Sequence, residues 1–422
     1  MTNRKLAILF REAVAAITET IISVICWILF FPLSLLVKRD SKLTLVISRK
    51  GFFFADNSKY FFVYAHEELK PDEKIIFLTS DRLLRDMIQK AGAEAVLHPS
   101  AGSLLLLLKC GTLVTDVVFS NFAPLIRGAK FIQIWHGAPL KHIELDLHNR
   151  RISNSPLPVK TALNMQKHII GRYPVYDIVV STSHKFVEHA FQSAFRTGRF
   201  ASTGYPRNDI LFGWPEKNTT AYRLSRLNVD IGAIQQVQNA KSGGKIICLY
   251  APTYRKNMTS PFDSVIDLNN LSDFAGRHNI LIVLKLHPVV QGRRAFHECP
   301  NILAYDSLGD VYPLMPLCDI LITDYSSIYF DYLLLGKPIV FFPYDLESYL
   351  EEDSNMYFNY GEMTPGPKCR TQKELEKELK KIVSEEDAAD YAAMRGRIST
   401  FTHDYQDNLS CRRLIEGFLH NR

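Results

Sequence analysis

Short runs of apolar, largely β-branched residues alternate with helical stretches along most of this chain, and the alternation occurs in two successive sets. The first set of predicted strands covers Leu43–Ser48, Lys74–Thr79, Leu113–Ser120, Lys130–Trp135 and Asp177–Ser181. The second set covers Lys245–Thr253, Ile280–Leu286, Ile302–Tyr305, Asp319–Thr323 and Pro338–Phe342. Continuous apolar strands are typical of parallel sheets that helices cover on both faces. The sequence therefore predicts an α/β fold of two Rossmann-like, doubly wound domains, with ligands at the carboxyl ends of the strands in a cleft between the domains.

An uncharged apolar run, Thr20–Val37, precedes the first predicted strand. As a helix its 18 residues would reach about 27 Å, slightly less than the hydrocarbon core of a bilayer. The run ends at Lys38 and Arg39 without a small-residue cleavage site, which argues against a removable signal peptide. Three interpretations stay open: a single membrane span, an amphipathic anchor in the plane of the interface, or a buried core helix. The first two place the protein on a membrane.

The 422 residues are enough for two domains with short segments around them. Near the C-terminus, Thr371 and Glu374 have the spacing of a capping box, and Leu375 and Leu379 follow on one helical face. We expect an N-terminal membrane-anchor segment over 1–42, a first Rossmann-like domain over 43–215, a polar linker or insertion over 216–244, a second Rossmann-like domain over 245–370, and closing helices over 371–422.

The charge of the chain is mildly positive, with 50 Lys and Arg against 44 Asp and Glu, a net of +6. The basic residues form short, separated clusters, whereas nucleic-acid binding favours a dense basic stripe or a recognisable aromatic motif. An anionic membrane surface or a phosphorylated substrate suits this distribution better. The seven cysteines are scattered and include no Cys-x-x-Cys pair, so the sequence indicates neither a zinc site nor a disulfide framework.

Two predicted strands end in a histidine. In the first half, the strand that ends at Trp135 is followed by His136, Gly137 and Pro139, where glycine allows close approach of the backbone to a substrate. In the second half, the segment Leu284–Pro288 places a histidine in the equivalent position. A single histidine of this kind can equally be a structural residue. Two of them, one in each domain, could converge across the cleft and supply a general base and a group that stabilises charge on a phosphate.

A third motif, Asp319–Pro338, has the pattern of a strand, a tight turn and a helix. Ser326 and Ser327 fall at the start of the helix, where free backbone N–H groups and the helix dipole favour a phosphate. The alternative is that the serines only cap the helix. Because a carboxylate would repel a diphosphate, Asp324 is expected to bind hydroxyl or backbone N–H groups.

Two arginines are candidate phosphate clamps, because the guanidinium fork matches phosphate oxygens. Arg207 lies in the segment TGYPRND and Arg255 in the segment YAPTYR. Either could instead be the partner in a structural ion pair. The chain has no G-x-G-x-x-G, no P-loop and no Asp-x-Asp pair, so no metal or other cofactor is expected, and a helix N-terminus with basic side chains would hold a nucleotide diphosphate.

Taken in order, these motifs resemble those of the CDP-glycerol glycerophosphotransferases. They are Trp-His-Gly-x-Pro, Gly-Tyr-Pro-Arg-Asn-Asp, Ala-Pro-Thr-x-Arg, Lys-x-His-Pro and Thr-Asp-Tyr-Ser-Ser, within Phe119–Pro367. The resemblance implies a GT-B-like fold at the cytoplasmic side of the cell membrane, with an acceptor-side first domain and a CDP-glycerol-binding second domain. It also implies transfer of glycerol phosphate from CDP-glycerol to a hydroxyl of a lipid-linked glycan or polyol-phosphate chain, with release of CMP, in teichoic-acid-like or capsule synthesis.

The resemblance assigns roles to individual residues. It makes His136 the base that activates the acceptor hydroxyl and His287 a contact of the transferring phosphate. Together with the motif analysis, it gives as substrate-binding residues Trp135, Gly137, Pro139, Arg207, Thr253, Arg255, Lys285, Pro288, Thr323, Asp324, Tyr325, Ser326, Ser327 and Asp331.

The chain departs from the family pattern in two places. Ala138 follows His-Gly where the family commonly has Thr, and a short hydrophobic segment stands in place of the long N-terminal domain of many polymerases. The second departure favours a priming enzyme or a smaller transferase. CDP-ribitol as donor, a GT-B glycosyltransferase that uses a nucleotide sugar, and a non-catalytic membrane-peripheral binding protein remain as alternatives.

Overall fold

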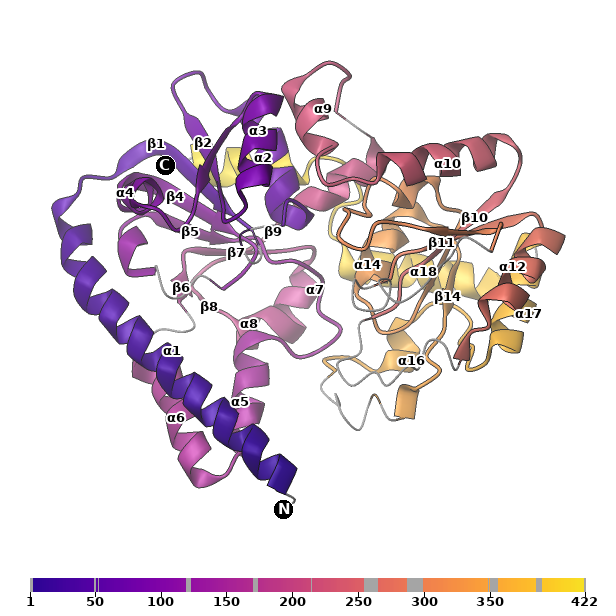
Figure 1. Cartoon of the computed structure of the whole chain (residues 1–422), viewed down its shortest axis with the longest axis horizontal. Helices are drawn as coiled ribbons and strands as arrows, with labels where there is room; N and C mark the ends of the chain where they lie inside the picture. Colours follow the sequence, from indigo (N-terminus) through magenta and orange to yellow (C-terminus); the bar gives the residue numbers. More distant parts are fainter. Residues whose placement is uncertain are drawn as a thin grey trace. The chain divides into compact units, whose positions relative to one another are not determined.

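The computed structural model describes residues 3–48, 51, 53–118, 123–169, 174–213, 215–253, 265–286, 299–347, 349, 356–384 and 389–420. The chain forms two compact units (Figure 1). Unit 1 contains Met1–Pro206, Glu216–Ser225 and Leu409–Arg422, and unit 2 contains Arg207–Pro215 and Arg226–Asn408. The region predicted as closing helices is therefore divided, because its last residues belong to unit 1 and the rest to unit 2.

Unit 1 is built on a seven-stranded parallel sheet with the strand order β3-β2-β1-β4-β5-β7-β9. This order, with the first strand near the middle, is that of a doubly wound α/β sheet. A separate parallel pair, β6 (Val175–Tyr176) and β8 (Arg196–Thr197), lies outside it. The seven strands are β1 (Asp40–Ile47), β2 (Lys74–Thr79), β3 (Glu94–Leu97), β4 (Cys110–Thr115), β5 (Lys130–Gln133), β7 (Ile178–Ser181) and β9 (Phe200–Ser202).

Buried aromatic and aliphatic side chains form the core of unit 1. Phe62 on α2 packs edge-on against Phe77 of β2, with ring centroids 5.3 Å apart. Asp81 caps α3, and Gly92 ends it at a left-handed φ of 103°. The helices of unit 1 are α1 (Asn3–Leu36), α2 (Asp56–Glu68), α3 (Arg82–Ala91), α4 (Ala101–Lys109), η2 (Ala123–Ile126), α5 (Glu144–Asn154), α6 (Leu157–Ile169), α7 (His184–Phe186), η3 (Val187–Phe191), α8 (Gln192–Ala194), α9 (Thr220–Ser225), α19 (Ser410–Ile415) and η7 (Glu416–His420).

The N-terminal apolar run is part of a longer helix, α1, which continues through Pro32 and lies along α6 and η2 (Figure 1). Much of its apolar surface is exposed; for example, Ile21 is 53% exposed and Ile28 is 67% exposed. These values disagree with the interpretation of a buried core helix. Over the part of the chain described, no helix meets the combined length and apolarity that crossing a bilayer requires.

Unit 2 is built on a five-stranded parallel sheet with the order β12-β11-β10-β13-β14. Ile282 of β11 and Ile322 of β13 belong to its core, which helices α12 and α17 complete. Its strands are β10 (Ile246–Tyr250), β11 (Ile280–Leu284), β12 (Ile302–Ala304), β13 (Ile320–Thr323) and β14 (Ile339–Phe341). Its helices are η4 (Pro206–Phe212), α10 (Ile231–Ser242), α12 (Leu268–Arg277), η5 (Met315–Leu317), α14 (Ile328–Tyr332), η6 (Leu333–Leu335), α16 (Tyr360–Met363), α17 (Gln372–Val383) and α18 (Ala389–Thr402).

The structure adds local detail to two predicted segments. The stretch 216–244, predicted as a polar linker or insertion, contains helices α9 and α10, of which α9 belongs to unit 1 and α10 to unit 2. Asp230 caps α10 through the N–H of Ala233, and Val237, on the inner face of this helix, is fully buried. In the predicted capping box, Thr371 accepts a hydrogen bond from the N–H of Glu374, which confirms the start of α17.

Candidate active site

The turn after β5 in unit 1 holds Trp135 in a strained conformation. Its φ is +46°, in the left-handed region that residues other than glycine rarely adopt. The N–H of Trp135 donates to Oε1 of Gln133 at 2.9 Å. The buried Asn57 amide donates to the carbonyl oxygens of Ile134 at 3.1 Å and Trp135 at 2.8 Å. Three hydrogen bonds therefore fix the direction in which the next residue, His136, leaves the sheet.

His136 is oriented by a carbonyl. Its Nδ1 lies 2.7 Å from the carbonyl oxygen of Asp116, which follows β4, the neighbouring strand. Because a carbonyl can only accept, Nδ1 carries the proton and the neutral ring has its lone pair on Nε2. The ring also packs on Trp135 at a centroid distance of 3.9 Å. This is the tautomer that a general base requires, on a half-buried side chain at the carboxyl end of a parallel sheet.

The residues after His136 are buried, and a tyrosine holds them. The hydroxyl of Tyr205 donates to the carbonyl oxygen of Gly137 at 3.2 Å, and Pro139 is buried beyond it. Gly204, next to this tyrosine, has a φ of +84°, and a Cβ there would lie 2.5 Å from Oγ of Ser410. The segment TGYPRND thus supports the histidine turn through its tyrosine and needs its glycine for packing.

In unit 2, the turn after β13 is tied to the end of β10. Oδ1 of Asp324 accepts from the N–H of Thr253 at 2.8 Å and from the N–H of Tyr325. The hydroxyl of Thr323 donates to the carbonyl oxygen of Ala251 at 2.7 Å. The expectation that Asp324 binds backbone N–H groups is confirmed. Strands β10 and β13 flank the point where the strand order reverses, which is where doubly wound sheets bind their ligands.

Aromatic contacts fix the same turn from its other side. Tyr325 is buried, stacks on Tyr349 at 3.9 Å, and donates to Oδ1 of Asp345 at 3.1 Å. Ser326 and Ser327 are half-buried. Ser327 makes no side-chain cap on α14, and Oγ of Ser326 accepts from the N–H of Ile328 only at 3.5 Å. Helix capping therefore accounts weakly for the two serines.

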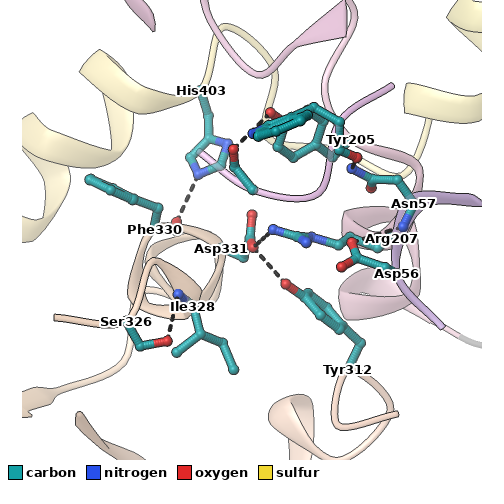
Figure 2. A network of polar contacts seen from close by, with 12 residues as sticks. Asp56, Asn57, Tyr205, Arg207, Tyr312, Ser326, Ile328, Phe330, Asp331 and His403 are labelled. Atoms are coloured by element: carbon teal, nitrogen blue, oxygen red, sulfur yellow. Dashed lines mark hydrogen bonds and ion pairs between the residues drawn. The ribbon is translucent and has the colours of Figure 1, made fainter. Parts of the chain in front are cut away.

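Arg207 and Asp331 pair with each other inside unit 2 (Figure 2). Nη2 of Arg207 lies 2.6 Å from Oδ2 of Asp331, and the two side chains are 3% and 0% exposed. The hydroxyl of Tyr312 donates to the same carboxylate oxygen at 2.7 Å, and the guanidinium lies 4.9 Å from the tyrosine ring. This buried ion pair supports the structural alternative for Arg207 rather than a phosphate clamp.

His403 lies beside this pair and anchors α14 (Figure 2). Its Nε2 donates to the carbonyl oxygen of Phe330 at 2.8 Å. Burial lowers the pKa of His403 below its usual value, although Asp331 nearby acts in the opposite direction. The ring is thus kept neutral, and it holds the helix that carries Asp331.

Lys285, predicted to bind substrate, holds a loop in the structure. Its Nζ donates to the carbonyl oxygens of Asp306 at 2.6 Å and Ser307 at 2.8 Å, after β12. The ammonium also lies 5.5 Å from the ring of Tyr305. Burial lowers the pKa of Lys285 to about 8.

The structure thus gathers the predicted residues into two groups. Trp135, His136, Gly137 and Pro139 form one turn in unit 1, and Thr253 with the segment 323–327 forms the other in unit 2. His287, Pro288 and Arg255 lie outside the described residues. Supporting residues that the motif analysis missed are Asn57, Asp116, Tyr205, Tyr312 and His403; of these, only Tyr205 stands within one of the motifs quoted above.

Two doubly wound parallel sheets, each with polar turns at the carboxyl ends of its strands, define an α/β fold of the kind that binds nucleotides at those ends. Residues 29–419 match the family model of CDP-glycerol:poly(glycerophosphate) glycerophosphotransferase. The chain belongs to this family and is an enzyme of the CDP-glycerol glycerophosphotransferase type.

Individual relatives agree with this assignment. The teichoic acid poly(glycerol phosphate) polymerase of Bacillus spizizenii is 28% identical over 344 residues, which are 80% of this chain and 82% of the relative. The teichoic acid glycerol-phosphate transferase of Staphylococcus aureus is 31% identical over 63% of this chain and 64% of the relative. Ribitol-phosphate enzymes, a polymerase and a primase of Bacillus spizizenii, match as well. The solved structure of the wall teichoic acid polymerase TagF shares the fold, with a TM-score of 0.72 at 23% identity over 98% of this chain and 97% of that chain.

Proposed function

We propose that this enzyme transfers glycerol phosphate from CDP-glycerol to an acceptor hydroxyl on a membrane-linked glycan or polyol-phosphate chain, in the synthesis of a teichoic-acid-like or capsular polymer. The observation that carries the proposal is the orientation of His136. The Asp116 carbonyl, 2.7 Å from Nδ1, gives Nε2 the lone pair with which a base removes a hydroxyl proton. Membership of the family supplies the substrate class.

In the reaction, the acceptor hydroxyl attacks the phosphorus that bears the glycerol, and its proton passes to Nε2 of His136. A new phosphodiester bond forms as the bond between this phosphorus and the bridging oxygen breaks, and CMP leaves with that oxygen. The displacement is direct, so it needs no covalent enzyme intermediate.

The donor diphosphate is assigned to the turn after β13. Its support is the position of Ser326 and Ser327 beside the strand-order reversal of unit 2, with Asp324 turned onto backbone N–H groups. His287, Arg255 and Pro288 remain proposed donor contacts on the strength of their motifs. The fold that we propose for the two units together is GT-B-like.

Association with the cytoplasmic face of the cell membrane is proposed to occur through α1. Its exposed apolar side chains, among them Ile21, Ile25, Ile28 and Leu29, suit a helix that lies in the plane of the interface. A peripheral anchor of this kind would keep a membrane-linked acceptor within reach.

The test is release of CMP from CDP-glycerol by the purified full chain, with membranes as acceptor. His136→Ala is expected to lower the rate at least a hundredfold, because it removes the proposed base. His189→Ala, which removes an exposed histidine of unit 1, is the matched control and should behave like the wild type. Unchanged turnover in His136→Ala would remove this residue as the base. Turnover with CDP-ribitol but not CDP-glycerol would replace the donor, a possibility that the ribitol-phosphate relatives favour over a nucleotide sugar.

A further inference from the structure

Unit 1 contains a cavity of about 680 Å³ at the edge of its sheet that lies opposite to His136. The position follows from the strands: Lys130 is the first residue of β5, and Asp177 and Arg199 directly precede β7 and β9. The amino ends of parallel strands share one edge, whereas His136 follows the carboxyl end of β5. The cavity is therefore separate from the proposed base, and its volume is in the range of small-ligand sites.

The lining of this cavity is strongly basic. Arg127, Lys130, Arg196 and Arg199 contribute four positive charges, against the single carboxylate of Asp177. Oδ2 of that carboxylate accepts a hydrogen bond from the N–H of Phe131 at 2.6 Å. An excess of guanidinium groups around one concave site matches the oxygens of a phosphate.

Several contacts hold the basic residues in place. Nζ of Lys130 donates to the carbonyl oxygen of Phe418 at 2.7 Å, and the Arg199 guanidinium lies 4.7 Å from the ring of the same phenylalanine. Arg39 donates to the carbonyl oxygens of Leu125 at 2.7 Å and Arg127 at 2.5 Å, which fixes the turn after η2. These contacts hold the side chains of Lys130 and Arg199 and the backbone at Arg127, while the guanidinium groups of Arg127 and Arg199 stay exposed to a ligand.

The cavity adjoins the apolar helix α1. Trp27 of α1 is part of the lining, and the guanidinium of Arg127 lies 4.5 Å from the ring of Phe31, one helical turn further on. Trp27 is 38% exposed, and Ile28 beside it is 67% exposed. A tryptophan between an apolar surface and a cluster of basic residues is typical of the level at which lipid headgroups lie.

We propose that this cavity binds the phosphate of an anionic membrane phospholipid, whose acyl chains lie along the exposed apolar side chains of α1. The proposal rests on the membrane association of α1 proposed above and adds a defined headgroup site to it. Such a site would favour binding to anionic membranes. Because it lies between α1 and the sheet of unit 1, it would also fix the orientation of unit 1 on the membrane surface.

Flotation of the full chain with lipid vesicles tests the proposal. The variant Arg196→Gln/Arg199→Gln removes two cavity charges, and Arg82→Gln/Lys90→Gln removes two exposed charges from α3 as the matched control. We expect the cavity variant to bind vesicles that contain phosphatidylglycerol roughly tenfold or more weakly than the wild type, and the control to bind like the wild type. All three proteins should bind pure phosphatidylcholine vesicles equally, through α1.

Three results would overturn the headgroup site. The first is an equal loss of binding to anionic vesicles in both double variants, and the second is unchanged binding of the cavity variant. The third is displacement of the wild type from anionic vesicles by inorganic phosphate at a concentration equal to that of the lipid phosphate. Each of them leaves membrane binding through α1 intact. Failure of the wild type to bind any vesicle would remove both the site and the anchor. CMP release measured in parallel reports on the catalytic proposal independently, because neither arginine lies in the catalytic turns.

Discussion

At the scale of single residues, the site depends on side chains that orient others. In the proposed reaction His136 acts through Nε2, because Nδ1–H donates its hydrogen bond to the carbonyl oxygen of Asp116. Asn57 and Gln133 hold the peptide groups of Trp135 at its positive φ. Strain of this kind persists where the surroundings over-determine it, which is common at active sites. Such supporting residues are positioning residues, and their loss should be felt both in stability and in turnover.

The variant Asn57→Ala should separate the effect on stability from the effect on turnover. It leaves the buried carbonyl oxygens of Ile134 and Trp135 without their amide donor, which is expected to cost about 1–3 kcal/mol in the free energy of unfolding. Because the turn then relaxes, kcat for CMP release should fall more than KM changes. Urea unfolding and steady-state kinetics measure the two quantities, with the helix-surface variant Asn239→Ala as control. Normal kcat in a destabilised Asn57→Ala protein would show that the turn does not need this amide.

A second prediction at the scale of single residues concerns the stability that the Arg207–Asp331 pair gives to unit 2. Arg207→Met is expected to destabilise unit 2 by about 3–5 kcal/mol, since it leaves a buried carboxylate without its cation. Arg370→Met breaks an exposed pair with Glu347 and should cost less than about 1 kcal/mol. Denaturant unfolding compares the two. A stable Arg207→Met protein with a raised KM for CDP-glycerol would instead support the phosphate-clamp hypothesis.

At the scale of elements, the sequence predicted the strands of the two sheets better than the helices and side chains that pack around them. All ten predicted strands are present, because each lies within a continuous apolar segment bounded by turn residues. The strands β3, β6, β8 and β9 escaped prediction. They have two to four residues, and β8 and β9 include polar residues, whereas the equally short β12 and β14 lie within longer apolar segments. The stretch 216–244 is polar on average, yet buried positions such as Val237 make α10 a helix. The position of His136 followed from the strand that precedes it. Asn57 contacts the His136 turn of unit 1, and His403 contacts α14 of unit 2, each from a segment distant in sequence, so no local motif predicted either role.

Protonation of His403 is expected to make the free energy of unfolding depend on pH, because this residue anchors α14. Its pKa is lower in the folded than in the unfolded chain, where the ordinary value is 6.5. The unfolded state therefore binds more protons below pH 6.5, so the stabilisation is complete above that pH and is lost as the pH falls further. Urea unfolding on both sides of pH 6.5 should show a steeper acid loss for the wild type than for His403→Gln. Equal slopes would contradict the account, and His189→Gln, at an exposed histidine, is the control.

At the scale of the whole molecule, the chain combines two doubly wound units with an exposed apolar helix. Each unit presents a structured turn at the carboxyl ends of its strands, one with a histidine and the other with two serines. Unit 1 alone also carries α1 and the basic cavity at its opposite edge. We infer a division of labour in which unit 1 meets the membrane-linked acceptor and unit 2 holds the soluble donor.

The prediction at the scale of the whole molecule concerns membrane binding through α1. Ile21→Glu/Ile28→Glu places two charges on the exposed surface of α1 and should reduce vesicle flotation at least tenfold, with little change in unfolding. Leu83→Glu/Met87→Glu makes the same change on exposed apolar positions of α3 and should float like the wild type. Equal flotation of both variants and the wild type would show that α1 does not anchor the protein.

Direct transfer of glycerol phosphate fixes the ratio of the two products, so the stoichiometry of the reaction tests it. With CDP-glycerol and acceptor membranes, phosphorus NMR should show one new phosphodiester for every CMP released, and neither signal with His136→Ala. CMP released together with free glycerol phosphate, or phosphodiester formation that persists in His136→Ala, would contradict the account.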